Sequence, residues 1–134
     1  MSMKPDITTV TDIKLVVDTF YEGVKQDALL GPIFTDLMQV NWENHLPKMY
    51  AFWEHLLFQT GNYQGRPFPP HLKVNSMVPL GDAHFSNWIN LFEQTVDDLF
   101  EGPNATTLKQ KAHSIQQIWN LKMNLLNMPV GSTF

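Results

Sequence analysis

Four long stretches of the chain repeat apolar side chains every three to four residues, and none alternates apolar and polar side chains as a half-buried strand does. The stretches cover about residues 9–27, 41–59, 82–101 and 104–127. Together they place well over half of the chain in helices, against roughly a third in an average globular protein. The sequence therefore predicts an all-α fold.

The first stretch has a clear beginning and a clear end. Thr9 and Asp12 have the spacing of a capping box, in which each side chain accepts a hydrogen bond from the other's backbone N–H. Tyr21 lies at the edge of the apolar stripe. That stripe is Ile13, Val16, Val17, Phe20 and Val24. Gly31-Pro32 ends this region, and residues 33–37 are expected to form at most a short helical turn.

The second stretch contains a proline close to its start. A proline is tolerated only in the first turn of a helix, so Pro47 predicts that the regular helix begins near Asn44. The predicted inward face is His45, Met49, Phe52, Trp53 and Leu56.

The next segment, from Thr60 to Gly81, is rich in proline and glycine and is expected to be irregular. So long an irregular segment in a small domain usually has a functional reason. Asp82 is then the expected N-cap of the third helix, and Gly102-Pro103 its end. The predicted inward residues of the third helix are Phe85, Trp88, Ile89, Phe92, Val96 and Leu99. Those of the fourth are Leu108, Ala112, Ile115, Trp119 and Leu126.

Charge and composition exclude several classes of protein. The net charge of −4 opposes nucleic-acid binding, which needs a basic face to replace counterions. The absence of cysteine excludes disulfides, thiol catalysis, iron–sulfur clusters and thioether-attached haem. No apolar run reaches the ~18–20 residues of a membrane span, and residues 1–10 lack a signal-peptide core. We expect residues 1–134 to form a single domain that is cytoplasmic, monomeric and without a membrane partner.

No familiar catalytic motif appears. The five histidines lack the Glu-x-x-His spacing of di-iron bundles and the His-x-x-x-His spacing of zinc proteases. There is no glycine-rich phosphate loop and no Gly-x-Ser-x-Gly elbow. His84, His55 and His113 are expected to be surface or capping residues.

Four side chains with polar tips nevertheless stand out. Tyr21, His45 and Trp88 all point towards the helical interior, either as core residues whose polar atoms are satisfied locally or as the lining of a ligand pocket. His71 follows Pro69-Pro70, either as an exposed loop residue or as an imidazole that a stiff loop presents to a cofactor.

An ordered set of motifs covers nearly the whole chain, from about residue 6 to 128. They are Phe20-Tyr21, Gly31-Pro32-Ile33-Phe34, Trp42-x-x-His45, Phe52-Trp53, Tyr63-x-Gly65-x-Pro67, His71 and Phe85-x-x-Trp88. With these motifs the chain resembles the truncated haemoglobins of group III. The resemblance implies a two-over-two sandwich of helices around one b-type haem, with the usual proximal helix reduced to loop and a short turn.

The resemblance also implies roles for individual residues. His71 matches the proximal histidine that ligates the iron, and Tyr21, His45 and Trp88 match the distal residues that stabilise a ligand. The matching pocket-lining residues are Phe20, Phe34, Met49, Phe52 and Trp53. The candidates for contact with the haem propionates are Lys48, Tyr63 and Arg66. Pro47 departs from the family pattern and puts the position of His45 in doubt.

Chemistry agrees with this resemblance. Haem is an apolar disc with anionic edges, so it needs aromatic walls, one protein ligand and a cation near its rim. Without cysteine, the iron ligand must be His, Met or Tyr. A single histidine leaves the sixth position of the iron open to O₂, NO or CO.

The hydrogen-bond donors on the distal side predict how the protein would bind and release O₂. Tyr21 and Trp88 can both donate hydrogen bonds to a ligand with partial negative charge, which predicts tight binding and slow release of O₂. The enzymatic alternative is an NO dioxygenase or peroxidase-like activity, with His45 as a proton relay and a separate reductase as partner. A third possibility is a helical interaction domain with no cofactor.

Overall fold

A computed structural model describes residues 4–63 and 65–128. Within these ranges every regular element is helical. The elements are α1 (Val10–Gln26), the π-helical turn η1 (Ile33–Leu37), α2 (Trp42–Phe58), α3 (Phe68–Met77), α4 (Asp82–Leu99) and α5 (Pro103–Leu126). The prediction of an all-α fold is confirmed, as is the expected short turn at residues 33–37.

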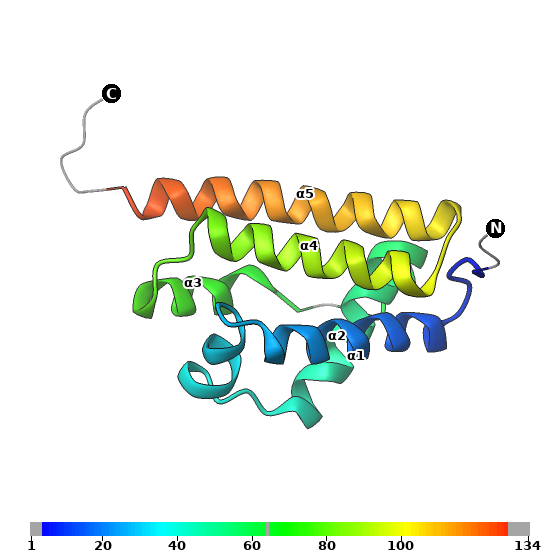
Figure 1. Ribbon diagram of the computed structural model, residues 1–134, viewed down its shortest axis with the longest axis horizontal. Coiled ribbons are helices and arrows are strands. Elements are labelled where there is room, and N and C mark those ends of the chain that lie inside the picture. Colours follow the sequence, from blue (N-terminus) through cyan, green and yellow to red (C-terminus); the bar gives the residue numbers. More distant parts are fainter. Residues whose placement is uncertain (1–3, 64, 129–134) are drawn as a thin grey trace.

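The four long helices form two packed pairs. α4 and α5 lie side by side as one layer, and α1 and α2 form the other (Figure 1). The layers meet where α1 contacts α4 and where α2 contacts α5. This is the two-over-two sandwich that the resemblance implies. The shorter α3 lies under the C-terminal half of α5 (Figure 1).

The core divides into a large and a small apolar cluster. The large cluster joins α1, α2, α4 and α5, and its largest fully buried side chains include Phe20 and Phe92. The small cluster lies at the α3 end of the molecule. It consists of Val74, Leu80, Phe85 and Met123, with Phe68 and Trp119 packed against it. The functional candidates lie on the elements that border both clusters.

The capping box predicted for α1 is confirmed. The Thr9 hydroxyl accepts a hydrogen bond from the backbone N–H of Asp12 at 3.2 Å, and the Asp12 carboxylate accepts one from the N–H of Thr9 at 3.1 Å. The stripe of α1 is buried as expected, and so is Tyr21, which is only 6 % exposed.

The prediction that α2 begins near Asn44 is wrong. The helix begins at Trp42, because the side chain of Asn41 caps it by accepting a hydrogen bond from the N–H of Glu43 at 3.1 Å. Pro47 is therefore held inside the helix, beyond the first turn. It has no N–H to bond the carbonyl of Glu43, so α2 keeps its regular start at the expense of one hydrogen bond.

The expectation of an irregular segment from Thr60 to Gly81 is also wrong, since α3 occupies the middle of it. Its prolines lie at the start of the helix, where Pro67 is the N-cap and Pro69 and Pro70 are in the first turn. The first-turn N–H groups of a helix have no intrahelical acceptor, so prolines there forfeit nothing. The proximal segment is thus a helix of ten residues, not loop and a short turn.

Two smaller expectations need correction. The N-cap of α4 is Gly81 and not Asp82, and His84 supplies the cap by accepting a hydrogen bond from the N–H of Gly81 at 3.1 Å. In α5, Leu126 is 58 % exposed, whereas Met123 is fully buried. Met123 follows Trp119 by four residues and therefore lies on the same inward face of α5, whereas Leu126 points away from that face.

A distant carboxylate caps the start of α5. Asp6 accepts hydrogen bonds from the backbone N–H groups of Asn104 and Ala105, at 3.0 and 2.9 Å. The approach needs Gly102, whose φ of +146° suits glycine and where a Cβ atom would lie 2.5 Å from Cγ of Asp6. This contact ties the N-terminal arm to α5.

Candidate functional site

His71 lies on the first turns of α3 and has one ring nitrogen fixed. Its Nδ1 lies 2.7 Å from the carbonyl oxygen of Pro67, the N-cap residue of the same helix. A carbonyl can only accept, so Nδ1 carries the proton and Nε2 keeps its lone pair. The ring also packs on Trp119 of α5, with centroids 4.6 Å apart. Such an imidazole is oriented and neutral, as a metal ligand must be.

Burial supports the neutral form of this imidazole. It lowers the pKa of His71, and the hydrogen bond to Pro67 opposes that shift only in part. The structure therefore differs from the expectation of an imidazole on a stiff loop. The ring is partly buried and sits on a helix, and a backbone carbonyl sets its tautomer.

Tyr21 and His45 contact each other. The hydroxyl of Tyr21 and Nε2 of His45 are 3.2 Å apart, and the two rings meet edge to face. Burial lowers the pKa of His45, and the positive charges that His71 and Lys48 can carry lower it further. Burial raises the pKa of Tyr21. Both groups are thus neutral near pH 7, and Pro47 does not keep His45 from reaching Tyr21.

His71 lies on α3 and is near enough for its positive charge to lower the pKa of His45 on α2. The structure thus brings Tyr21 and His45 into contact from positions more than twenty residues apart in the sequence, with His71 within electrostatic reach of His45.

Several of the aromatic side chains that the resemblance assigns to the pocket walls contact one another around Tyr21. Phe20 is buried and meets Tyr21 and Trp88 edge to face, at 5.1 and 5.9 Å. Phe34 packs on Tyr21 at 5.9 Å. Met49 and Phe52 are partly buried and pack against the large cluster. Flat apolar walls of this kind suit a planar apolar group.

Trp88 belongs to a stack of aromatic rings. Its ring lies nearly parallel to Phe92 at 5.8 Å and to Trp53 at 6.3 Å, and Trp53 is itself buried. The stack anchors Trp88 in the core on one side, and its partly buried ring contacts Phe20 on another. A Trp fixed in this way has little freedom to turn its indole N–H.

The side chains predicted to contact the haem propionates are more exposed. Lys48 and Arg66 lie at the surface, and Tyr63 is partly buried with its ring against Phe52 at 5.2 Å. A Cβ atom at Gly65 would lie 2.6 Å from the Tyr63 hydroxyl, so glycine lets this side chain fold back over its own loop. Lys48 is near enough to influence the pKa of His45, which places its charge beside the site.

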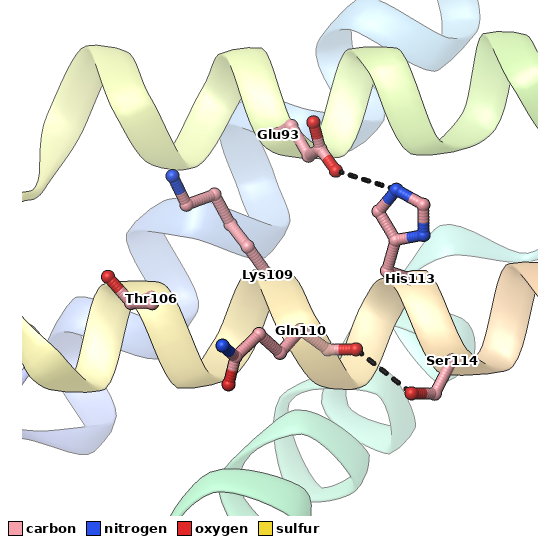
Figure 2. A pocket seen from close by; sticks show the side chains of 6 residues that line it. All are labelled: Glu93, Thr106, Lys109, Gln110, His113 and Ser114. Atoms are coloured by element: carbon pink, nitrogen blue, oxygen red, sulfur yellow. Dashed lines mark hydrogen bonds and ion pairs between the residues drawn. The ribbon is translucent and has the colours of Figure 1, made fainter.

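The remaining histidines take the surface and capping roles predicted for them. His55 accepts a hydrogen bond from the N–H of Gly61 at 2.9 Å, and His113 lies 3.5 Å from Glu93. His113 lines an open hollow of about 420 Å³ between α4 and α5, where its ring points towards Glu93 (Figure 2). None of the residues that line this hollow is a predicted site residue. They are Glu93, Thr106, Lys109, Gln110, His113 and Ser114.

Sequence reasoning missed several residues that shape the site. Pro67 acts through its backbone carbonyl, which no side-chain motif reveals. Trp119 was predicted to face inward, but its contact with His71 was not foreseen. Trp42 packs on Phe34 with the rings stacked at 6.0 Å, and it also contacts Tyr21 and His45. Its place three residues before His45 was the only signal.

The donor set fits a haem better than a metal ion held by protein alone. In residues 4–63 and 65–128 no three His, Asp or Glu side chains gather as a metal site. A haem iron takes four of its ligands from the porphyrin and needs one from the protein, which is what the free Nε2 of His71 offers. The aromatic walls and the charge of Lys48 match the apolar face and anionic edge of the group. Among the described helices, none is long and apolar enough to cross a membrane.

Comparison with known proteins gives the same answer. No model of a protein family matches the chain. The group 3 truncated hemoglobin ctb of Campylobacter jejuni is 29% identical over 116 residues, which cover 84% of this chain and 89% of that protein. The crystal structure of a group III truncated hemoglobin from Campylobacter jejuni has a TM-score of 0.79 and 28% identity, over 98% of this chain and all of the other. In sequence and in fold the chain is therefore similar to group III truncated haemoglobins, which supports a globin-type haem protein.

Proposed function

We propose that the protein binds one b-type haem without a covalent bond, with Nε2 of His71 as the iron ligand, and that it takes up O₂ and other diatomic gases such as NO and CO. One observation carries this proposal. Nδ1 of His71 is bonded to the carbonyl of Pro67, so Nε2 is left to ligate a metal, and His71 is close enough to the Tyr21–His45 pair for its charge to lower the pKa of His45. Haem held by His71 would supply an iron able to bind such a gas.

The proximal residues prepare a neutral and oriented imidazole. The carbonyl of Pro67 holds the proton on Nδ1, and Trp119 fixes the plane of the ring. Because burial lowers the pKa of His71, protonation does not compete with metal binding at neutral pH. Phe20, Phe34, Met49, Phe52 and Trp53 form the walls in this proposal, and Lys48, Tyr63 and Arg66 the rim.

His45 and a bound ligand compete for the hydrogen bond that the Tyr21 hydroxyl can donate. A phenol is a better donor than a neutral imidazole, so the Tyr21 hydroxyl donates to Nε2 of His45 when no ligand is present. A ligand with partial negative charge draws the same O–H away, because hydrogen bonds to charged acceptors are the stronger ones. Trp88 is the second donor in this proposal. Tyr21 and Trp88 thus retain O₂, and His45 limits how strongly Tyr21 does so.

Haem uptake tests the proposal. The purified protein is titrated with haemin, and absorption spectra of the ferric, ferrous and carbonyl forms are compared for wild type, His71→Ala and His113→Ala. We expect a Soret band in the wild type and in His113→Ala, because His113 is exposed on α5. We expect the band to be lost or strongly shifted in His71→Ala. A colourless protein that takes up no haemin would instead favour a helical interaction domain with no cofactor.

The Tyr21–His45 pair also favours a second function, an NO dioxygenase or peroxidase-like activity. The Tyr21 hydroxyl is hydrogen-bonded to His45, a neutral base that can accept and release a proton. Two such groups could act as general acid and general base for a reacting gas. This function requires a separate reductase that returns ferric iron to ferrous. Conversion of NO to nitrate is measured with O₂ and an added reductase. A rate no higher than that of free haemin would eliminate the enzymatic function and leave gas binding intact.

A further inference from the structure

We propose that Trp42 and Lys25 are positioning residues for the distal pair, and that the charge of Lys25 over the Trp42 ring holds His45 in its contact with Tyr21. The inference rests on the proposed function for its significance, since Tyr21 and His45 are the distal residues of that proposal. It gives a role to Trp42, which the sequence analysis included in a motif without a role, and to Lys25, which no motif contains.

Trp42 contacts three residues of the candidate pocket at once. Its ring lies 5.3 Å from Tyr21, 5.7 Å from His45 and 6.0 Å from Phe34, where the two rings are stacked at 22°. Phe34 also touches His45, at 6.4 Å. The imidazole of His45 is therefore enclosed by three aromatic rings, those of Tyr21, Phe34 and Trp42.

This enclosure limits where His45 can go. A movement of the imidazole from Tyr21 towards Phe34 or Trp42 would displace their stacked rings. Trp42 is the first residue of α2 and His45 lies one turn later. Both side chains are therefore attached to the first turns of the helix that Asn41 caps. Of the three rings around His45, that of Trp42 is the one on the same helix, so a shift of Trp42 would open space beside the imidazole.

Lys25 holds that ring from the side of α1. Its Nζ lies 4.5 Å from the centroid of Trp42, within the range of a cation–π contact. The ammonium group also lies 3.2 Å from the Glu22 carboxylate, one turn earlier on α1. Lys25 is in the last turn of α1, where a positive charge is further stabilised by the helix dipole. The Lys25 charge is thus placed by α1 and bridges α1 to the start of α2.

The chain offers a matched control on the same helix. Lys14 also lies over an aromatic ring, with Nζ 5.7 Å from the centroid of Tyr50 on α2. Tyr50 donates a hydrogen bond to Asp18 and makes no ring contact with His45. Lys14→Met and Lys25→Met therefore remove the same kind of contact between the same two helices, and only the second loosens Trp42.

The test follows the His45 ring by two methods. NMR of the purified protein reports the ring protons of His45, which nearby aromatic rings shift upfield. Resonance Raman spectra of the CO complex report the fraction of molecules with strong distal hydrogen bonding. The variants are Lys25→Met, Lys25→Arg, Trp42→Phe, Trp42→Leu and Lys14→Met, and circular dichroism checks that each one is folded.

We expect Lys25→Met to raise the fraction of molecules in which His45 has left Tyr21 by about two- to fivefold, as loss of an exposed cation–π contact implies. Trp42→Leu should raise it further, and Lys25→Arg should restore the wild-type value, because arginine also stacks on an aromatic face. Wild-type behaviour of Lys25→Met in both methods, or equal effects of Lys25→Met and Lys14→Met, would overturn the inference. If the protein takes up no haem, the proposed function fails, and the NMR measurement still decides this inference.

Discussion

Replacement of His45 by leucine should strengthen O₂ binding, although His45 lies beside the ligand. In the structure Nε2 of His45 is 3.2 Å from the Tyr21 hydroxyl, and burial keeps the imidazole neutral and able to accept. Tyr21 must therefore give up one hydrogen bond before it can donate to a ligand. Leucine retains the bulk of the site and removes the competing acceptor.

The size of the effect follows from the two hydrogen bonds. A bond to a neutral acceptor contributes about 0.5–1.5 kcal/mol, and one to a charged acceptor about 1.5–3 kcal/mol. The net gain that Tyr21 provides is the difference, about 1–1.5 kcal/mol, or roughly five- to tenfold in affinity. Tyr21→Phe should weaken O₂ binding by that factor. His45→Leu should tighten it by about two- to tenfold, because the full Tyr21 bond then goes to the ligand.

The assay combines O₂ release in a stopped-flow instrument with O₂ association after flash photolysis. The double variant Tyr21→Phe/His45→Leu is the control. In the Tyr21→Phe background, removal of His45 should change the O₂ affinity by less than about twofold, because both single substitutions act through the Tyr21 hydroxyl proton. Faster O₂ release in His45→Leu than in the wild type would refute this reasoning, because it would show that His45 itself donates to the ligand.

Two further predictions concern stability. Asp6→Ala should lower the free energy of unfolding by about 1–2 kcal/mol in urea titrations, as loss of a helix cap does, whereas the exposed Glu101→Ala should change it little. Burial tends to raise the pKa of Asp6, but hydrogen bonds from three backbone N–H groups outweigh it and bring the pKa below its usual value. The contribution of Asp6 to stability should therefore be complete above about pH 5 and decrease as the pH falls through the lowered pKa. A constant difference between the variants at acid pH would contradict this. Pro47→Ala should raise the free energy of unfolding by about 1–3 kcal/mol, because the new N–H can bond the carbonyl of Glu43, and an unchanged or lower melting temperature would show that the proline is needed where it stands.

The sequence was sufficient for the long helices because each has a wide apolar stripe. Ile13, Val16 and Phe92 are buried as their spacing predicts, and the Thr9–Asp12 pair marks the start of α1 correctly. These features are local, so no knowledge of the other helices is needed to find them.

The errors arose where proline was taken as a signal against helix. Pro69 and Pro70 lie in the first turn of α3, where they are compatible with a helix, and Pro47 lies inside α2, where tertiary packing outweighs its local preference. α3 also has little apolar periodicity, since Val74 is its one buried side chain. A helix that is stabilised by contacts with neighbouring segments, and not by a wide apolar stripe of its own, is hard to predict from the sequence.

The site was predictable by residue type but not by arrangement. The tautomer of His71 depends on the carbonyl of Pro67, and the neutral state of His45 depends on burial and on charges from α3 and α2. The enclosure by Trp42 depends on how η1 and the end of α1 meet the start of α2. These are contacts between segments, and a pattern within one segment does not encode them.

The bond between Nε2 of His71 and iron is the central claim, and resonance Raman spectra of the ferrous protein measure it most directly. We expect an iron–histidine stretching band that shifts on ⁵⁷Fe substitution, disappears in His71→Gly and returns when imidazole is added to that variant. An unchanged band in His71→Gly without imidazole would show that another residue ligates the iron, and would contradict the account.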